Sequence, residues 1–185
     1  IKRGTVVRDM NFDEIAKRRQ SCRSFDPARP AEPEAVEKCL RVARLAPSAC
    51  NAQPFVMWLV TGKAAVKIAE ARSLSGNRFL RDCTTFVIFS ETNYNASAKL
   101  GSVMKSQDYR SVDIGIAASY LTAEATELGL DSCLIGLFDE KKVKVALKIK
   151  GKERIRLIVA LGHAIEGYPQ REKKRKDPND LIKRV

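Results

Sequence analysis

Three segments of this sequence carry residue types that can bind an anionic ligand. The first, residues 17–25 (KRRQSCRSF), places cations, an amide and hydroxyls where a short predicted helix enters a loop. Arginine forks match phosphate oxygens through two parallel bonds, and neutral Ser and Gln side chains add further hydrogen bonds. The segment is therefore a candidate anion clamp. The alternative is a solvated helix end whose charges complement the helix dipole.

The other two segments lie in predicted loops. Residues 46–54 (APSACNAQP) hold Ser, Asn and Gln in a stretch that two prolines stiffen, either as a ligand-holding loop or as a simple connecting turn. Residues 170–178 (QREKKRKDP) are strongly basic, as in a solvated tail or a nucleic-acid-binding run. Neither segment identifies its ligand by composition alone.

Other chemistries have weaker support. The five cysteines are scattered and form no C-x-x-C pair, which disfavours a disulfide framework or a zinc site and favours a reducing cytosol. The only histidine, His163, falls in the predicted strand 154–164, so a Cys–His nucleophile would lack an available base. We interpret Asp113 as a helix cap with no catalytic role. The cysteines are Cys22, Cys39, Cys50, Cys83 and Cys133.

Length and composition predict one globular domain. The chain has 185 residues, 44% hydrophobic and 30% charged, and we assign residues 10–185 to the domain and residues 1–9 to a possible arm or expression remnant. No apolar run suits a membrane helix or a signal peptide, so we expect a cytoplasmic protein. The net charge of +12 favours an anionic partner, such as nucleic acid or a phosphate-bearing cofactor.

The hydrophobic pattern alternates between strands and helices. Strands are predicted at 55–60, 85–90, 133–138 and 154–164. Helices are predicted from a capping box at Asn11, from Pro33 to Ala46, over 64–72, from Asp113 to Leu128 and from Asp139 to Ile149. This order indicates a three-layer α/β or α+β domain, and periodicity does not separate the two.

Four motifs in order carry a family resemblance. They are R-R-Q-S-x-R-x-F at 18–25, A-P-S-A-x-N-x-Q-P-F at 46–55, E-L-G-L-D-S-C-L-I-G at 127–136 and G-H-x-x-x-G-Y-P at 162–169, before the basic tail. The chain resembles the FMN-dependent nitroreductase family from about Met10 to its end. The resemblance implies an α+β, three-layer α-β-α sandwich with a mostly antiparallel sheet. It also implies an intertwined homodimer with FMN at the subunit interface.

The resemblance also assigns candidate FMN-binding residues. The first FMN-binding segment of the family matches Arg19, Gln20, Ser21 and Arg23, whose arginines would hold the phosphate or the pyrimidine edge. A loop that reaches the flavin from the partner subunit matches Pro47, Ser48 and Asn51. Asn77 lies near a flavin-contacting Asn of the family. The segment whose backbone N–H approaches flavin N5 matches Ile135, Gly136 and Leu137, and the basic pair on the phosphate matches Lys174 and Lys176.

The implied activity is ping-pong electron transfer from NAD(P)H through FMN to a nitro compound or a quinone, without a catalytic side chain. Residues 91–112, with Tyr94 and Tyr109, are the predicted cover of the substrate face. Dehalogenation or flavin fragmentation on the same scaffold, a nucleic-acid-binding module and a flavin carrier without turnover are the alternatives. We expect a small aromatic acceptor, and neither nucleic acid nor a membrane as partner.

Overall fold

The centre of the fold is a four-stranded antiparallel sheet. The computed structural model describes residues 10–71, 76–93 and 107–185. Strands β1 (Phe55–Val60), β2 (Thr85–Glu91), β3 (Asp131–Ile135) and β4 (Ile155–Gly162) lie in the order β1-β2-β4-β3. Every residue of β2 is buried, including the polar Thr85, Ser90 and Glu91 at its ends, as befits a central strand covered on both faces. Because all three pairings are antiparallel, the fold is α+β rather than α/β.

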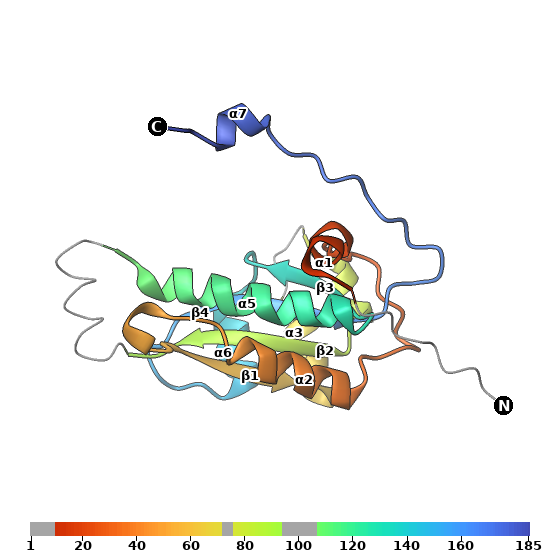
Figure 1. Ribbon diagram of the computed structural model, residues 1–185. Helices are drawn as coiled ribbons and strands as arrows, with labels where there is room; N and C mark the ends of the chain where they lie inside the picture. The colour runs from red at the N-terminus through yellow and green to blue at the C-terminus, as the bar shows by residue number, and fades with distance from the viewer. Residues whose placement is uncertain (1–9, 72–75, 94–106) are drawn as a thin grey trace.

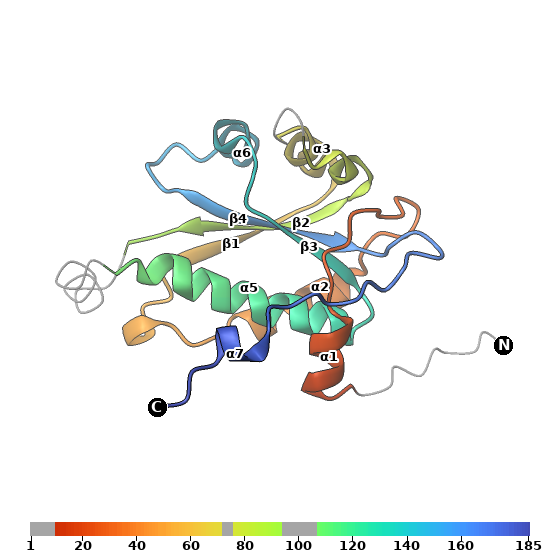
Figure 2. The ribbon, with the colours of Figure 1, turned by 90° about the horizontal axis from the view of Figure 1, so that it is seen from above.

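Helices cover both faces of this sheet (Figures 1 and 2). Helices α3 (Gly62–Glu70) and α6 (Glu140–Leu147) lie on one face, and α2 (Pro33–Ala43) and α5 (Tyr109–Glu127) on the other. Each side has its own apolar core, with Phe86 and Ile88 facing α3 and α6 and Phe89 and Leu121 in the other layer. The predicted three-layer arrangement is confirmed.

Local signals in the sequence fix several helix starts. Asn11 and Glu14 form the expected capping box at α1 (Phe12–Arg18), and Asp139 accepts a hydrogen bond from Lys142 N at the start of α6. Pro33 begins α2, as predicted, although the helix ends at Ala43 rather than at Ala46. Helix α1 buries no residue, and the chain ends in a short helix α7 (Pro178–Leu181) far along an extended tail (Figure 1).

The prediction for Asp113 is wrong. Helix α5 begins at Tyr109 and is capped by Asp108, whose carboxylate accepts from Ser111 N, so Asp113 lies inside the first turns of the helix. Asp113 is 2% exposed and accepts a hydrogen bond of 3.1 Å from Ala49 N instead. It therefore anchors the 46–54 loop to α5. Tyr109, predicted in a loop, is helical, while residues 1–9 and most of the predicted 91–112 cover, with Tyr94, lie outside the described residues.

Two strand boundaries also differ from the prediction. Strand β3 begins at Asp131 and ends at Ile135, so Gly136 and Leu137 belong to the connection to α6 rather than to the strand. Strand β4 ends at Gly162, which leaves His163 just beyond it, where its Nε2 lies 2.9 Å from Glu32 Oε1. Continuous apolar runs do not mark strand ends, because the residues after a strand also pack against the core.

Two short 3-10 turns complete the described fold: η1 (Ala49–Asn51) and η2 (Arg78–Asp82). Cys50, Asn51 and Gln53 have φ of 50°, 51° and 44°, in the left-handed region that non-glycine residues rarely adopt. These three left-handed residues lie in the loop between α2 and β1. In the described parts of the chain, no helix is both long and apolar enough to cross a membrane.

Candidate functional site

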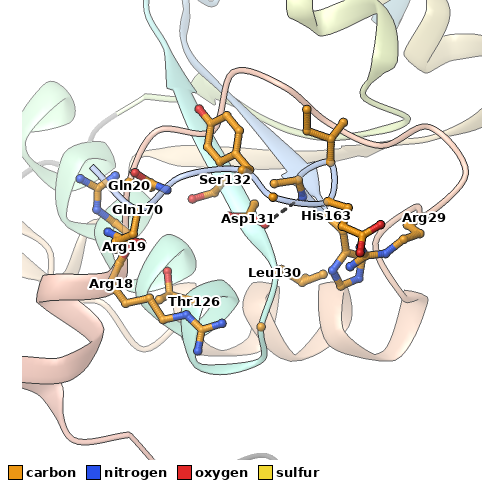
Figure 3. A pocket seen from close by; sticks show the side chains of 16 residues that line it. Arg18, Arg19, Gln20, Arg29, Thr126, Leu130, Asp131, Ser132, His163 and Gln170 are labelled. Atoms are coloured by element: carbon orange, nitrogen blue, oxygen red, sulfur yellow. Dashed lines mark hydrogen bonds between the residues drawn. The ribbon is translucent and has the colours of Figure 1, made fainter. Parts of the chain in front are cut away.

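The first basic segment and the start of the tail lie side by side (Figure 3). The Lys173 ammonium donates to the Arg19 carbonyl, and the Arg171 guanidinium donates to the Ser21 carbonyl. The Gln20 side chain receives a bond of 3.1 Å from Arg171 N and donates one of 3.1 Å to Pro169 O. Two segments about 150 residues apart in the sequence are thus held together by several bonds.

The sheet positions the first of these segments. Ser21 forms a parallel bridge with Ser132 of β3, and Phe25 forms an antiparallel bridge with Ala164 just after β4. Cys22 N donates to Ser132 O at 2.8 Å, and the buried Phe25 ring packs in the core. Because the segment pairs with the outer edge of β3, its neighbouring cations are held at that edge.

The positive charges at this junction repel one another. Burial, followed by the charges of Arg19, Arg175 and Arg171, lowers the pKa of Lys173 below the ordinary lysine value. A bound dianionic phosphate would reverse this repulsion and accept charge-assisted hydrogen bonds. The donor set at this position therefore fits a phosphate group.

A polar pocket of about 360 Å³ adjoins this cationic cluster. Arg18, Arg19, Gln20 and Ser132 contribute to its lining (Figure 3). Ser132 is 2% exposed, and its hydroxyl has no hydrogen-bond partner among the described residues. An unpaired buried hydroxyl costs roughly 1–3 kcal/mol, so Ser132 is a candidate partner for a ligand atom in the adjoining pocket.

An apolar surface continues along the edge of β3. Leu134 is 38% exposed and Leu137 is 64% exposed, whereas the Ile135 side chain is buried in the core. A Cβ added to Gly136 would meet no atom within 4 Å, so open space faces this residue. A planar apolar ring next to a phosphate group fits this combination of surfaces. Ile135 can contribute only its backbone.

Ser132 and Leu134 are candidate site residues that the motif comparison did not assign to FMN binding. Side chains alternate across a strand, so Cys133 and Ile135 point into one core while Ser132 and Leu134 share the other side. The sequence Asp-Ser-Cys-Leu-Ile contained this alternation. The signal was obscured because the predicted strand began at Cys133 rather than at Asp131.

Asn77 lies next to the predicted N5-facing segment. Its amide nitrogen donates to the Leu137 carbonyl at 2.9 Å, which places it against residues 60 positions later in the sequence. Two of the predicted site elements are thus brought together. However, the Asn77 amide donates its hydrogen bond to the protein backbone and is therefore not directed only toward a ligand.

Both lysines of the predicted tail pair, Lys174 and Lys176, are exposed. The hydrogen bond to Arg19 comes from their neighbour Lys173, whose ammonium donates to the Arg19 carbonyl. Arg23 is also exposed, and its backbone N–H donates to the Tyr168 hydroxyl at 3.0 Å. We therefore add Lys173 to the candidate phosphate-binding residues.

The loop with Pro47, Ser48 and Asn51 does not join this site within one chain. It precedes β1, which is at the opposite edge of the sheet from β3, and it contacts the start of α5 through Ala49 and Asp113. The end of α5 at Glu127 lies beside the start of β3, and a rise of ~1.5 Å per residue separates Asp113 from Glu127 by roughly 20 Å. Internal bonds rigidify the loop: Gln53 N donates to Ser48 Oγ and the Gln53 amide to Asn51 Oδ1, each at 3.0 Å.

The buried thiols are poor nucleophiles. Burial raises the pKa of Cys22 to about 11 and the pKa values of Cys39 and Cys83 to about 12. Thiolate is the reactive form of cysteine, so these three side chains remain protonated at neutral pH. The geometry offers anion binding and an apolar platform rather than covalent catalysis.

Comparisons with known proteins agree with this fold. The family model described as "Nitroreductase family" matches residues 16–75 and 71–163. The oxygen-insensitive NADPH nitroreductase of Helicobacter pylori is 27% identical over 203 residues, which cover 90% of this chain and 97% of the relative.

Solved structures match over nearly the whole chain. A nitroreductase family protein from Streptococcus pneumoniae superposes with a TM-score of 0.81 at 21% identity, over 95% of this chain and 100% of that one. An FMN-dependent nitroreductase from Clostridium difficile has a TM-score of 0.68 at 25% identity, over 90% and 92% of the two chains. With the four motifs, the antiparallel sheet and the family match over most of its length, this chain belongs to the nitroreductase family.

Proposed function

We propose that this protein binds FMN along the edge of β3 and transfers electrons from NAD(P)H to a small aromatic acceptor. Nitro compounds and quinones are the acceptor classes that we expect, in two successive half-reactions at one open face. The observation that carries the proposal is the contact between Arg19 and Lys173 beside the polar pocket. The NADPH nitroreductase relative supports the choice of reaction.

The residues divide by the part of FMN that each would hold. Arg19 and Lys173 would hold the phosphate, because the Lys173 ammonium bonds the Arg19 carbonyl and because burial and then the charge of Arg19 lower the pKa of Lys173. The hydroxyls of Ser21 and Ser132 would hold the ribityl chain, together with Gln20. Arg23 would hold the pyrimidine edge of the ring. Lys174 and Lys176 would strengthen the positive field around the phosphate.

The ring would lie on the apolar part of the edge. Leu134 and Leu137 offer exposed apolar surface, and the backbone of residues 135–137 would approach N5 where Gly136 leaves space. When bound, FMN supplies hydride chemistry that no side chain of this chain can perform. The protein's own groups bind and orient the cofactor and exclude water from one of its faces.

A second chain would complete the site. The rigid loop with Pro47, Ser48 and Asn51 cannot reach the β3 edge of its own subunit, so we propose that it covers the flavin of a partner in an intertwined homodimer. The exposed apolar residues Val112 and Tyr120 on α5 are 47% and 40% exposed and suit a buried subunit contact.

The colour and reactivity of the purified protein test this proposal. A yellow protein that is bleached by NAD(P)H without oxygen, and is recoloured by a nitro compound or a quinone, is the expected result. A protein that binds FMN but does not oxidise NAD(P)H would indicate a flavin carrier. A screen of acceptors with the reduced protein separates nitro or quinone reduction from dehalogenation or flavin fragmentation.

A residue test addresses the phosphate site. The variant Arg19→Ala should purify largely without FMN, whereas Arg41→Ala, an exposed arginine on α2, should retain it. A charge-assisted hydrogen bond contributes about 1.5–3 kcal/mol, which corresponds to roughly a 10- to 150-fold loss of affinity. Stoichiometric FMN in the Arg19→Ala protein would refute the phosphate assignment.

A further inference from the structure

The connection between β3 and α6 lies at the site but belongs to neither element. Gly136 and Leu137 are exposed, and Gly136 has no side chain to restrict its backbone. Such a connection samples many conformations unless other bonds hold it. The part of the chain proposed to face N5 therefore needs an external support.

Bonds from the α3–η2 region supply this support. Asp139 N donates to Ala71 O at 2.7 Å, and the Asn77 amide donates to Leu137 O at 2.9 Å. The two bonds act on positions 137 and 139, on either side of the partly buried Phe138 ring, which packs against the core. Together these two bonds fix the position of the exposed connection relative to the α3–η2 region.

Asn77 is specialised for this contact in two ways. Its backbone is left-handed, with φ of 61° and ψ of 33°, a conformation that asparagine tolerates better than most residues. It occupies the N-cap position of η2, yet its side chain makes no capping bond there. An asparagine at an N-cap commonly bonds the next turn. Here the amide reaches across to Leu137 instead.

We infer that Asn77 is a positioning residue: its amide holds the Leu137 carbonyl, and through it the peptide groups of residues 136 and 137 that face the proposed flavin ring. This inference rests on the proposed function for the identity of the ligand. The hydrogen bond from Asn77 to Leu137 involves only protein atoms and does not depend on that ligand. Asn77 acts through the 136–137 backbone and is not a catalytic residue.

The variant Asn77→Gly isolates the amide. Glycine keeps the left-handed backbone without strain, so the turn at η2 survives while the hydrogen bond to Leu137 is lost. Lys148→Gly is a matched control, because Lys148 is also left-handed, with φ of 57°, and lies exposed at the end of α6. Asn77→Asp is a second variant that keeps the size of the side chain and replaces the donor by a carboxylate.

Hydrogen exchange of the apo protein is the first measurement. Asn77→Gly and Asn77→Asp should speed exchange of the Asp139 amide, which donates to Ala71 O in the same connection, about 3- to 10-fold, as expected for the loss of one net hydrogen bond, while Lys148→Gly leaves it unchanged. Unchanged exchange in both Asn77 variants would refute the inference that Asn77 holds the Leu137 carbonyl in place.

Flavin titration is the second measurement. Both Asn77 variants should bind FMN about 3- to 10-fold more weakly and shift its midpoint potential relative to the wild type and Lys148→Gly. Faster exchange of the Asp139 amide with an unaltered FMN potential would overturn the positioning role. Wild-type protein that takes up no FMN would refute the proposed function, and the exchange rates would then still decide whether Asn77 holds the turn.

Discussion

A single methyl group at Gly136 should separate the stability of this protein from its ability to bind a flavin. The φ of Gly136 lies outside the left-handed region, and an added Cβ would meet no protein atom within 4 Å. At such a position Gly→Ala stabilises a protein by about 0.4–1 kcal/mol, since the unfolded chain loses freedom. For a chain of this size, that change raises the melting temperature of the apo protein by roughly 1–4 °C.

The same methyl group should weaken FMN binding. If the ring lies against residues 135–137, the methyl occupies space that the ring needs, and overpacking of this kind costs about 1–3 kcal/mol. The dissociation constant should therefore rise roughly 5- to 150-fold. Thermal melts of the apo protein and quenching of FMN fluorescence measure the two effects separately. Wild-type affinity in a stabilised Gly136→Ala protein would refute our placement of the ring.

Three further predictions concern the cationic pocket. Ser132→Ala should stabilise the apo protein by about 1 kcal/mol, because it removes an unpaired buried hydroxyl, and should weaken FMN binding; a less stable apo protein in thermal melts would contradict this. Lys173→Gln should weaken FMN binding roughly 10- to 150-fold, measured by titration at low and high salt, whereas Lys142→Gln on α6 should not. The lowered pKa of Lys173 also predicts a pH effect: the folded protein binds this proton less tightly than the unfolded chain, so apo stability should rise with pH as Lys173 deprotonates below the ordinary value of 10.5. Melting temperatures from neutral to alkaline pH measure that slope, which Lys173→Gln should reduce.

The sequence alone specified the local elements. Asn11 with Glu14, Pro33 and Asp139 begin helices where their side chains predict, because a cap depends on residues within one turn. The β-branched and aromatic residues at 85–90 predicted a strand, which the structure confirms as β2. Motif order predicted the family, which the comparisons confirmed.

Long-range pairing was decided by the tertiary structure. Periodicity could not distinguish α/β from α+β, because both place apolar strands between helices, and only the antiparallel registers settle the class. The sequence around Asp113 is typical of a helix cap. In the structure Asp108, five residues earlier, caps α5, and the Asp113 carboxylate accepts a hydrogen bond from Ala49 N. Local residue types cannot decide between two neighbouring capping candidates when a distant loop competes for one of them.

The candidate site also depends partly on the sequence and partly on the tertiary structure. The sequence supplied the cations of residues 17–25 and of the tail, and their charge alone favoured an anionic ligand. Only the folded chain shows that Lys173 reaches Arg19, that the Ser132 hydroxyl is buried without a partner and that Asn77 holds Leu137. Charge and side-chain type are properties of single residues, whereas burial and proximity arise from the packing of segments that the sequence keeps far apart.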